Sequence, residues 1–174
     1  LQIFMGIRNP ATLLPVLYDV SADKSPPQFW GDKDPLDVRW SDTLALLRDS
    51  APEIPVTVWC NEDAPLIWGQ IMREMAGLPT MAPLDGEFDL LETIMRPEGM
   101  KRFKSYLASH PEMTMAEHPR VIAAFLDKYV IDDALEEELD MPSWTEELVE
   151  EMTEVYDEDV ARIQEIPGVR VILP

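Results

Sequence analysis

A short run of three residues, Arg8-Asn9-Pro10, stands where an apolar strand is expected to pass into a helix. In open α/β sheets, ligands bind at the carboxyl ends of the strands, where the N-terminus of a helix can offer N–H donors to a phosphate. An arginine at that point adds a permanent charge that can bind phosphate or sulfate with two parallel hydrogen bonds. The run therefore suggests an anion site at Arg8. The alternative is that Arg8 pairs with one of the many carboxylates of the chain.

Two acidic residues, Glu62 and Asp63, follow the second expected strand and precede a helix. At the end of a strand they could orient an acceptor substrate or act as a base. Acidic residues are also favoured at the start of a helix without any chemistry, because they interact with the positive end of the helix dipole. Both interpretations of this pair remain open at this point.

The remaining reactive side chains give weaker signals. His110 and His118 each precede a proline, and neither has a cysteine or a second histidine at the spacing of a zinc site, so we expect no metal. Cys60 lies in an apolar strand beside Trp59, which favours a buried, unreactive thiol.

Acidic residues are concentrated late in the chain. From Tyr129 to Ala161 there are fourteen Asp or Glu and no Lys or Arg. A solvated helix face, a docking surface for a basic protein and a metal site are all compatible with this run, although the spacing and glycine of an EF-hand are missing. The basic cluster Lys101-Arg102-Phe103-Lys104 could pair with the run within the chain.

The elements that must position these residues alternate in the first half of the chain. Apolar and β-branched runs predict strands, and capping residues with helical periodicity predict helices. Expected strands are Gln2–Ile7, covered on both faces, Val56–Cys60 and Val169–Leu173; helices are expected after Asn9 and over Ser41–Ser50, Ala64–Met75, Glu87–Met95, Pro97–Ser109, Pro119–Glu138 and Ser143–Gln164. Asn9 is expected to cap the first helix, with Pro10 in its first turn and Pro15 kinking or shortening it.

Turn and capping residues mark further boundaries of the expected elements. Residues Asp23–Asp37 predict a long loop, Gly77 a helix end, and Ser143-Trp144-Thr145-Glu146 a capping box. Alternating strands and helices indicate an α/β fold with a small parallel sheet and a helix-rich C-terminal half. We expect one domain over residues 1–174, with an α/β part at 1–85 and a mainly helical part at 86–174.

Composition excludes several classes of protein. The 174 residues include 34 acidic and 14 basic side chains, for a net charge of −20, which argues against nucleic-acid or membrane partners. No apolar run approaches the roughly 20 residues of a membrane span. A single cysteine predicts a reducing, cytoplasmic location. Because Leu1 is not a methionine and a strand begins almost at once, we expect that residues precede it, with processing as the alternative.

The segment from Ile3 to Pro10 resembles the core segment of the P-loop sulfotransferase superfamily, where a hydrophobic strand ends in Arg-Asx-Pro. The strand Val56–Cys60 with its acidic ending is similar to a later strand of that family. The closing Trp144-Thr145-Glu146 helix and Pro167-Gly168-Val169 look like the end of uncharacterised bacterial sulfotransferase-like proteins. The resemblance implies an incomplete P-loop-type three-layer sandwich. It also implies that Arg8, with Asn9, binds 3′-phosphoadenosine 5′-phosphosulfate, and that Glu62 and Asp63 lie on the acceptor side.

Two features depart from that family. A serine usually follows the arginine by eight residues as a second phosphate contact, and here the position is Val16, which cannot donate a hydrogen bond. The phosphosulfate-binding loop, Gly-x-x-Lys-Thr-Gly-Thr, does not occur in residues 1–174. This chain alone is therefore not expected to hold the cofactor fully or to catalyse transfer. Two hypotheses follow: a nucleotide-binding sulfotransferase-like domain, and a non-catalytic module whose acidic helices bind a basic protein.

Overall fold

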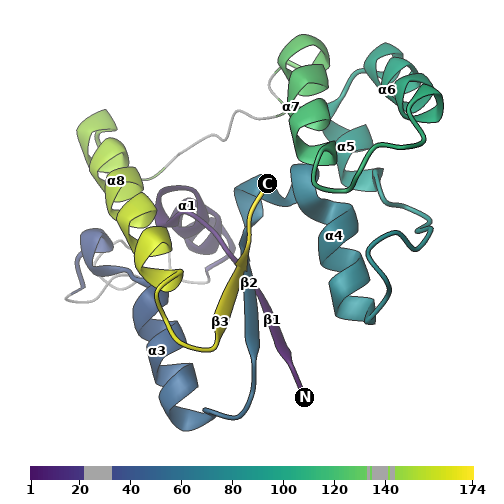
Figure 1. Ribbon diagram of the computed structural model, residues 1–174. Coiled ribbons are helices and arrows are strands. Elements are labelled where there is room, and N and C mark those ends of the chain that lie inside the picture. The colour runs from purple at the N-terminus through teal and green to yellow at the C-terminus, as the bar shows by residue number, and fades with distance from the viewer. Residues whose placement is uncertain (22–32, 133, 135–140, 142–143) are drawn as a thin grey trace. The chain divides into compact units, whose positions relative to one another are not determined.

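The computed structural model describes residues 1–21, 33–132, 134, 141 and 144–174 (Figure 1). These residues form two compact units. The first comprises Leu1–Asn61 and Glu138–Val171, and the second comprises Glu62–Glu137 and Ile172–Pro174. Each unit has a hydrophobic core of its own.

A three-stranded parallel sheet forms the centre of the first unit. Its strands are β1 (Ile3–Ile7), β2 (Val56–Cys60) and β3 (Val169–Ile172), and β2 lies in the middle. β1 pairs with β2 in parallel from Ile3 opposite Val56 to Ile7 opposite Cys60. Because the register ends on that last pair, the residues that follow, Arg8 and Asn61, leave the sheet at the same edge.

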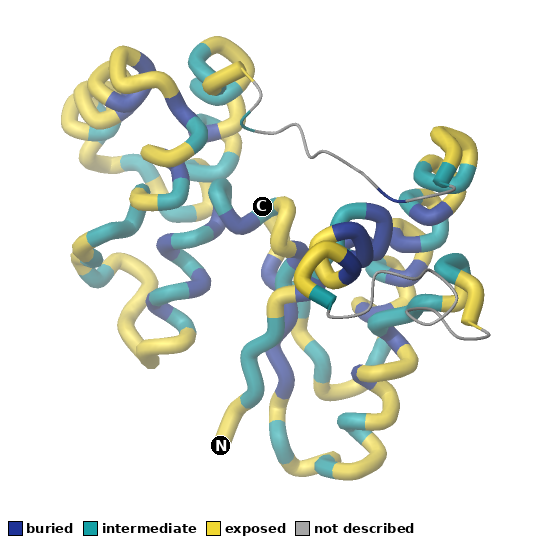
Figure 2. The backbone as a smooth tube through the Cα atoms, turned by 180° about the vertical axis from the view of Figure 1, so that it is seen from behind, coloured by how far each residue is buried: buried dark blue, intermediate teal, exposed yellow. Residues whose placement is uncertain are grey.

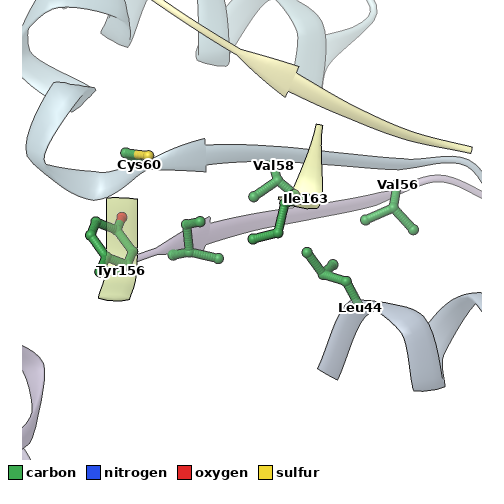
Figure 3. Close-up of a cluster of buried hydrophobic side chains, with 7 residues drawn as sticks. Leu44, Val56, Val58, Cys60, Tyr156 and Ile163 are labelled. Atoms are coloured by element: carbon green, nitrogen blue, oxygen red, sulfur yellow. The ribbon is translucent and has the colours of Figure 1, made fainter. Parts of the chain in front are cut away.

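One face of this sheet is covered by the helices α3 (Trp40–Ser50) and α8 (Glu146–Ile163). Figure 3 shows side chains of both helices meeting those of the strands, and the buried cluster consists of Ile7, Leu44, Val56, Val58, Cys60, Tyr156 and Ile163. Every second strand residue faces the helices, as the alternation of a strand requires. This core confirms the expectation that the thiol of Cys60 is buried.

β1 is less buried than expected. It lies at an edge of the described sheet, with three half-buried residues followed by the exposed Gly6, and its N-terminal end is exposed in Figure 2. On the face turned away from Ile7, the indole of Trp59 lies over Gly6, where a Cβ atom would come within 3.1 Å of its Nε1 atom. The prediction of a strand covered on both faces was therefore wrong for β1, because Gly6, on the face away from the helices, is exposed.

The helix α1 (Pro10–Val20) begins as the sequence predicts. The side chain of Asn9 accepts a hydrogen bond from the N–H of Ala11, and Pro10 occupies the first helical position. Pro15 lies inside the helix, yet the helix continues five residues beyond it to Val20. Pro15 therefore does not end the helix.

The N-terminus of α3 is capped from another helix. The expected cap, Ser41, is inside the helix, and the residue at the cap position, Arg39, makes no capping bond. The buried carboxylate of Asp159, on α8, instead accepts hydrogen bonds from the N–H of Trp40 at 2.7 Å and of Ser41 at 3.1 Å, and from the Ser41 hydroxyl. Thus a side chain distant in sequence does what a local cap usually does.

The start of α8 also differs from the prediction. Thr145 is the N-cap and accepts a hydrogen bond from the N–H of Leu148 at 3.2 Å. The capping box required Ser143 as the cap, and Ser143 lies outside the described residues. With Thr145 as the cap, the third helical residue is the apolar Leu148, which has no side-chain acceptor to complete a box.

The second unit is helical. A short 3₁₀ helix η2 (Asn61–Asp63) leads into it, and its helices are α4 (Ala64–Ala76), α5 (Asp89–Ile94), α6 (Pro97–Ser109) and α7 (His118–Tyr129). Gly77 ends α4 with a left-handed φ of 66°, as expected. The core of this unit is Leu91, Met95, Met100, Phe103 and Ile122.

α7 is shorter than the predicted Pro119–Glu138. After Tyr129 the backbone forms an antiparallel bridge between Val130 and Met95, and the N–H of Ile131 donates to the carbonyl of Ile94 at 2.9 Å. These bonds turn the chain out of the helix. Most of the predicted remainder, residues 133 and 135–138, lies outside the described residues.

The coarse fold prediction is confirmed: the chain is α/β with a small parallel sheet and is mostly helical. The three-layer P-loop sandwich and the single domain over residues 1–174 stay predictions. Of the loop expected at Asp23–Asp37, residues 23–32 lie outside the described residues, and Pro35–Asp37 forms a 3₁₀ helix, η1. A search of the described residues finds no helix with the length and apolar character to cross a bilayer.

Replacing Asp159 by alanine should destabilise the first unit. The variant removes the acceptor of two backbone N–H groups, of the buried Ser41 and the half-buried Trp40, which should lower the free energy of unfolding by about 2 to 4 kcal/mol. Asp159→Asn, which keeps one oxygen, should lose less. Urea denaturation gives the comparison, with Asp157→Ala as control because Asp157 is exposed on the same helix. Equal losses at positions 157 and 159 would contradict the capping role.

Candidate functional site

Arg8 lies at the carboxyl edge of the sheet, directly after β1, as the sequence predicts. It is half-buried, and its Nε atom donates a hydrogen bond to the hydroxyl of Thr12 at 3.0 Å. Its backbone carbonyl accepts a hydrogen bond from the indole of Trp40 at 2.8 Å. The guanidinium and the main chain of Arg8 are therefore each tied to a neighbouring helix, through Thr12 on α1 and Trp40 on α3.

Asn9 is buried and its side chain joins two helices. Its Oδ1 atom caps α1, and its Nδ2 atom donates to the hydroxyl of Thr153, on α8, at 3.1 Å. Its carbonyl accepts from the N–H groups of Thr12 and Leu13, at 3.0 and 2.9 Å. These contacts give Asn9 a structural role, and its predicted contact with a cofactor stays untested.

The start of α1 does not offer the phosphate cradle that the sequence suggests. Pro10 has no N–H, and the next three N–H groups, of Ala11, Thr12 and Leu13, already donate to Asn9. The expectation that this helix end presents unused donors is therefore corrected. An anion at this edge would be bound by side chains, with Arg8 as the nearest cation.

Thr12 is the residue at this site that the sequence reasoning missed. It follows Arg8 by four residues, and its hydroxyl accepts from the guanidinium and donates to the carbonyl of Asn9 at 3.2 Å. Val16, at the position where the sulfotransferase pattern has serine, is 46% exposed. The spacing of four residues between a strand-end arginine and a helix hydroxyl was the available signal.

Glu62 and Asp63 lie in the second unit, whereas Arg8 belongs to the first. Glu62 is exposed and Asp63 is half-buried in η2. Burial raises the pKa of the Asp63 carboxyl above its ordinary value, and the neighbouring charge of Glu62 raises it further. A raised pKa makes the Asp63 carboxylate a stronger base than an ordinary aspartate.

The histidines and the cysteine do not assemble a metal site in the described residues, where no group of three or more ligating side chains is found. The ring of His110 stacks on Tyr106 with centroids 4.1 Å apart, and its Nδ1 atom lies 2.8 Å from the carbonyl of Tyr106. His118 lies at the start of α7 and belongs to a different cluster, described next.

A buried ion pair in the second unit was not foreseen from the sequence. The guanidinium of Arg73, on α4, donates to the Glu87 carboxylate at 2.9 Å and to the carbonyl of Ala82 at 2.8 Å. Only 5% of the Arg73 side chain and 15% of the Glu87 side chain are exposed. The Nδ1 atom of His118 lies 3.9 Å from that carboxylate, is buried, and has no hydrogen-bond partner in the described residues.

Gly69 makes room for this cluster. It lies inside α4, and a Cβ atom there would come within 2.7 Å of the Cγ atom of Glu87 and 2.8 Å of the Arg73 guanidinium. A glycine within a helical pattern costs about 1 kcal/mol relative to alanine, so it often marks a close approach of this kind. Gly69 was thus the sequence signal for the cluster.

Comparison with known proteins adds no relative. No family model, no curated protein and no solved structure matches the sequence. The site is therefore interpreted from its own geometry.

Stability should depend on the protonation of His118. Burial lowers the pKa of its imidazole below the ordinary value of about 6.5, and this effect together with the Arg73 charge outweighs the opposing Glu87 and Glu117 carboxylates. The unfolded chain then binds more protons than the folded chain, so the free energy of unfolding should fall as pH drops below about 6.5. The difference in the free energy of unfolding between wild type and His118→Gln, measured by urea denaturation across this pH range, should show that slope.

His110→Gln is the matched control for this measurement, because the chain has two histidines. The dependence of the free energy of unfolding on pH that is assigned to His118 must persist when His110 is replaced. A slope that disappears equally in both variants, or that survives in His118→Gln, would contradict the assignment.

Proposed function

We propose that this chain is the nucleotide-binding part of a sulfotransferase-like protein, in which Arg8 binds the 3′-phosphate of 3′-phosphoadenosine 5′-phosphosulfate. The observation that carries the proposal is the position of Arg8 at the carboxyl end of a parallel strand, immediately before a capped helix. That is the position at which open α/β sheets bind their ligands. The resemblance of Ile3–Pro10 to the superfamily's core segment supplies the identity of the nucleotide.

The chemistry of the proposed contact is a charge-assisted hydrogen bond. The bond from Nε to Thr12 orients the guanidinium, and a phosphate dianion competes for its N–H donors with the partners that they have without ligand. Since the N–H groups of the first helical turn are occupied by Asn9, the side chain supplies most of the binding energy.

Transfer of the sulfuryl group needs a further part. The loop that would hold the 5′-phosphosulfate does not occur in residues 1–174, and no residue here replaces its lysine. In a protein that includes such a loop, we propose Glu62 and Asp63 for the acceptor side. Asp63, with its raised pKa, would be the base that accepts a proton from the acceptor hydroxyl.

Nucleotide binding is tested by isothermal titration of the intact protein with 3′,5′-adenosine bisphosphate. Loss of a hydrogen-bonded charge pair costs about 1.5 to 3 kcal/mol, so Arg8→Ala should weaken binding about 10-fold to 100-fold. Arg162→Ala, which removes an exposed arginine of the same unit, should leave the dissociation constant unchanged. No heat with the wild type, or equal effects of the two variants, would remove the nucleotide proposal.

A second candidate function is protein association without catalysis. On α8 the acidic residues Glu150, Glu151 and Glu154 are exposed, and none of them has an ion-pair partner among the residues that the structure describes. Glu154 follows Glu150 by four residues and Glu151 by three, so it neighbours both of them on the helix surface. A basic protein segment would find there a row of carboxylates to neutralise.

Charge reversal tests this second function. Binding of a labelled deca-lysine peptide should weaken at least about tenfold when Glu150, Glu151 and Glu154 are replaced by lysine, because three attractive contacts become repulsive. Reversing three other exposed acidic residues of the same unit, Asp49, Glu53 and Glu165, changes the net charge equally. If both triple variants lose affinity to the same extent, net charge explains binding and α8 is no specific surface.

A further inference from the structure

The helices α6 and α7 of the second unit lie side by side and run in opposite directions (Figure 1). Gly99, near the start of α6, faces Tyr129 at the end of α7, and Tyr106 faces Phe125 further along. Between the helices is an open groove of about 800 Å³. Ligand pockets for small molecules have volumes of about 300 to 1,000 Å³, so the groove can hold one.

Three aromatic rings follow one another along this groove. The rings of Phe125 and Tyr129 are stacked with centroids 6.1 Å apart, and those of Tyr106 and Phe125 are 5.8 Å apart. Phe125 is held from behind by the buried Phe103, 5.4 Å away. The rings therefore present flat apolar surfaces whose positions are set by the core, and 36% of Tyr106 is exposed.

Cations gather at one end of the groove. Arg102 and Lys128 lie over the ring of Tyr129, at 5.8 and 5.5 Å from its centroid, and Lys101 also lines the groove. Arg102 pairs with Glu98, whereas neither lysine has a carboxylate partner in the described residues. The groove is thus polarised, with positive charge at the Tyr129 end and aromatic surface toward Tyr106.

The surrounding segment has an unusual charge for this chain. Residues 96–128 include six of the 14 Lys and Arg but four of the 34 Asp and Glu, a local charge of +2 in a chain of −20. Because the rest of the molecule repels anions, a ligand would have to gain binding energy from close contacts in the groove itself. Long anionic polymers are disfavoured by the same repulsion.

The serine hydroxyls in the groove do not add anion donors. Ser105 donates to the carbonyl of Lys101 at 2.9 Å, and Ser109 donates to the carbonyl of Tyr106 at 2.8 Å. Their protons are used within α6. The charged donors that the groove offers an anion are the two lysines and Arg102.

We propose that this groove binds a small amphipathic anion, a molecule with a flat aromatic body and one phosphate, sulfate or carboxylate group. The anionic group lies among Lys101, Arg102 and Lys128, and the aromatic body stacks on Phe125 and Tyr106. Both parts are needed: the cations are exposed and bind weakly alone, and the rings by themselves select no charge. This site is independent of Arg8 and of the proposed sulfotransferase-like function.

The test uses 2-naphthyl phosphate as the probe, titrated into the intact protein and followed by calorimetry. It should bind at least tenfold more tightly than inorganic phosphate, which has no ring, and than 2-naphthol, which has no charge. A hexaglutamate peptide is the fourth ligand. If it binds as tightly as 2-naphthyl phosphate, the groove is a surface for acidic peptides and the proposal is overturned.

Variants locate the site. Lys101→Gln combined with Lys128→Gln should weaken the binding of 2-naphthyl phosphate about tenfold. Tyr106→Leu should weaken that binding severalfold and leave the binding of inorganic phosphate unchanged. Lys104→Gln is the matched control, because Lys104 is an exposed lysine on the same helix that pairs with Glu92 and does not line the groove. Arg8→Ala should not change the affinity. Unaltered binding in the double variant, or an equal loss with Lys104→Gln, would overturn the proposal.

Discussion

The first unit depends on a buried carboxylate. Asp159, 2% exposed, accepts two backbone N–H bonds from the start of α3 and a third bond from the Ser41 hydroxyl. A charged group can be buried at tolerable cost only when its lone pairs are satisfied, and here the donors come from a helix end that has no side-chain cap of its own. These hydrogen bonds therefore satisfy the carboxylate of α8 and the first N–H groups of α3 together. They also fix where α3 begins relative to α8.

From this bond a series of contacts leads to the edge of the sheet. Trp40, whose N–H is held by Asp159, donates its indole N–H to the carbonyl of Arg8. Six residues earlier on α8, the hydroxyl of Thr153 accepts a hydrogen bond from the side-chain amide of Asn9. The end of β1 is thus held from α3 and from α8, and a residue placed there has a fixed main chain. Such preorganisation is what an anion-binding side chain needs, because less freedom is lost when the ligand arrives. The Oδ1 atom and the carbonyl of Asn9 occupy the first N–H groups of α1, so this edge of the sheet offers an anion no free backbone donor there.

Features with a local cause could be predicted from the sequence. Asn9 with Pro10 specifies a helix start, Gly77 a left-handed helix end, and the run of β-formers at Val56–Cys60 a buried strand; all three are present. Ser41 also fits the local rule for a cap, yet a distant carboxylate takes that role, and no local pattern reveals it. The spacing of Met152, Tyr156, Asp159 and Ile163 places Asp159 on the buried face of α8, which was the available clue. Of the three interpretations left open for the acidic run, the solvated helix face therefore does not hold at position 159. The ion pair of Arg73 and Glu87 joins residues fourteen apart in sequence. Gly69 signalled a close approach to α4, but no local pattern identified Glu87 as the residue that approaches.

Charge in this chain is separated rather than mixed, and the described ion pairs explain how. Arg102 and Lys104, which could have paired with the distant acidic run, pair instead with Glu98 and Glu92, which are closer in sequence. Arg96 pairs with Asp132, at the start of that run. Pairs between exposed neighbours contribute about 0 to 1 kcal/mol each, so they neutralise charge locally without holding elements together. The exposed carboxylates of α8 and the lysines between α6 and α7 consequently stay available to solvent. Charges that serve the fold are buried and satisfied, Asp159 by hydrogen bonds and Arg73 by an ion pair. Buried charges and exposed charges thus have different roles in this protein. The buried ones stabilise the fold, and the exposed ones can bind a ligand or a partner.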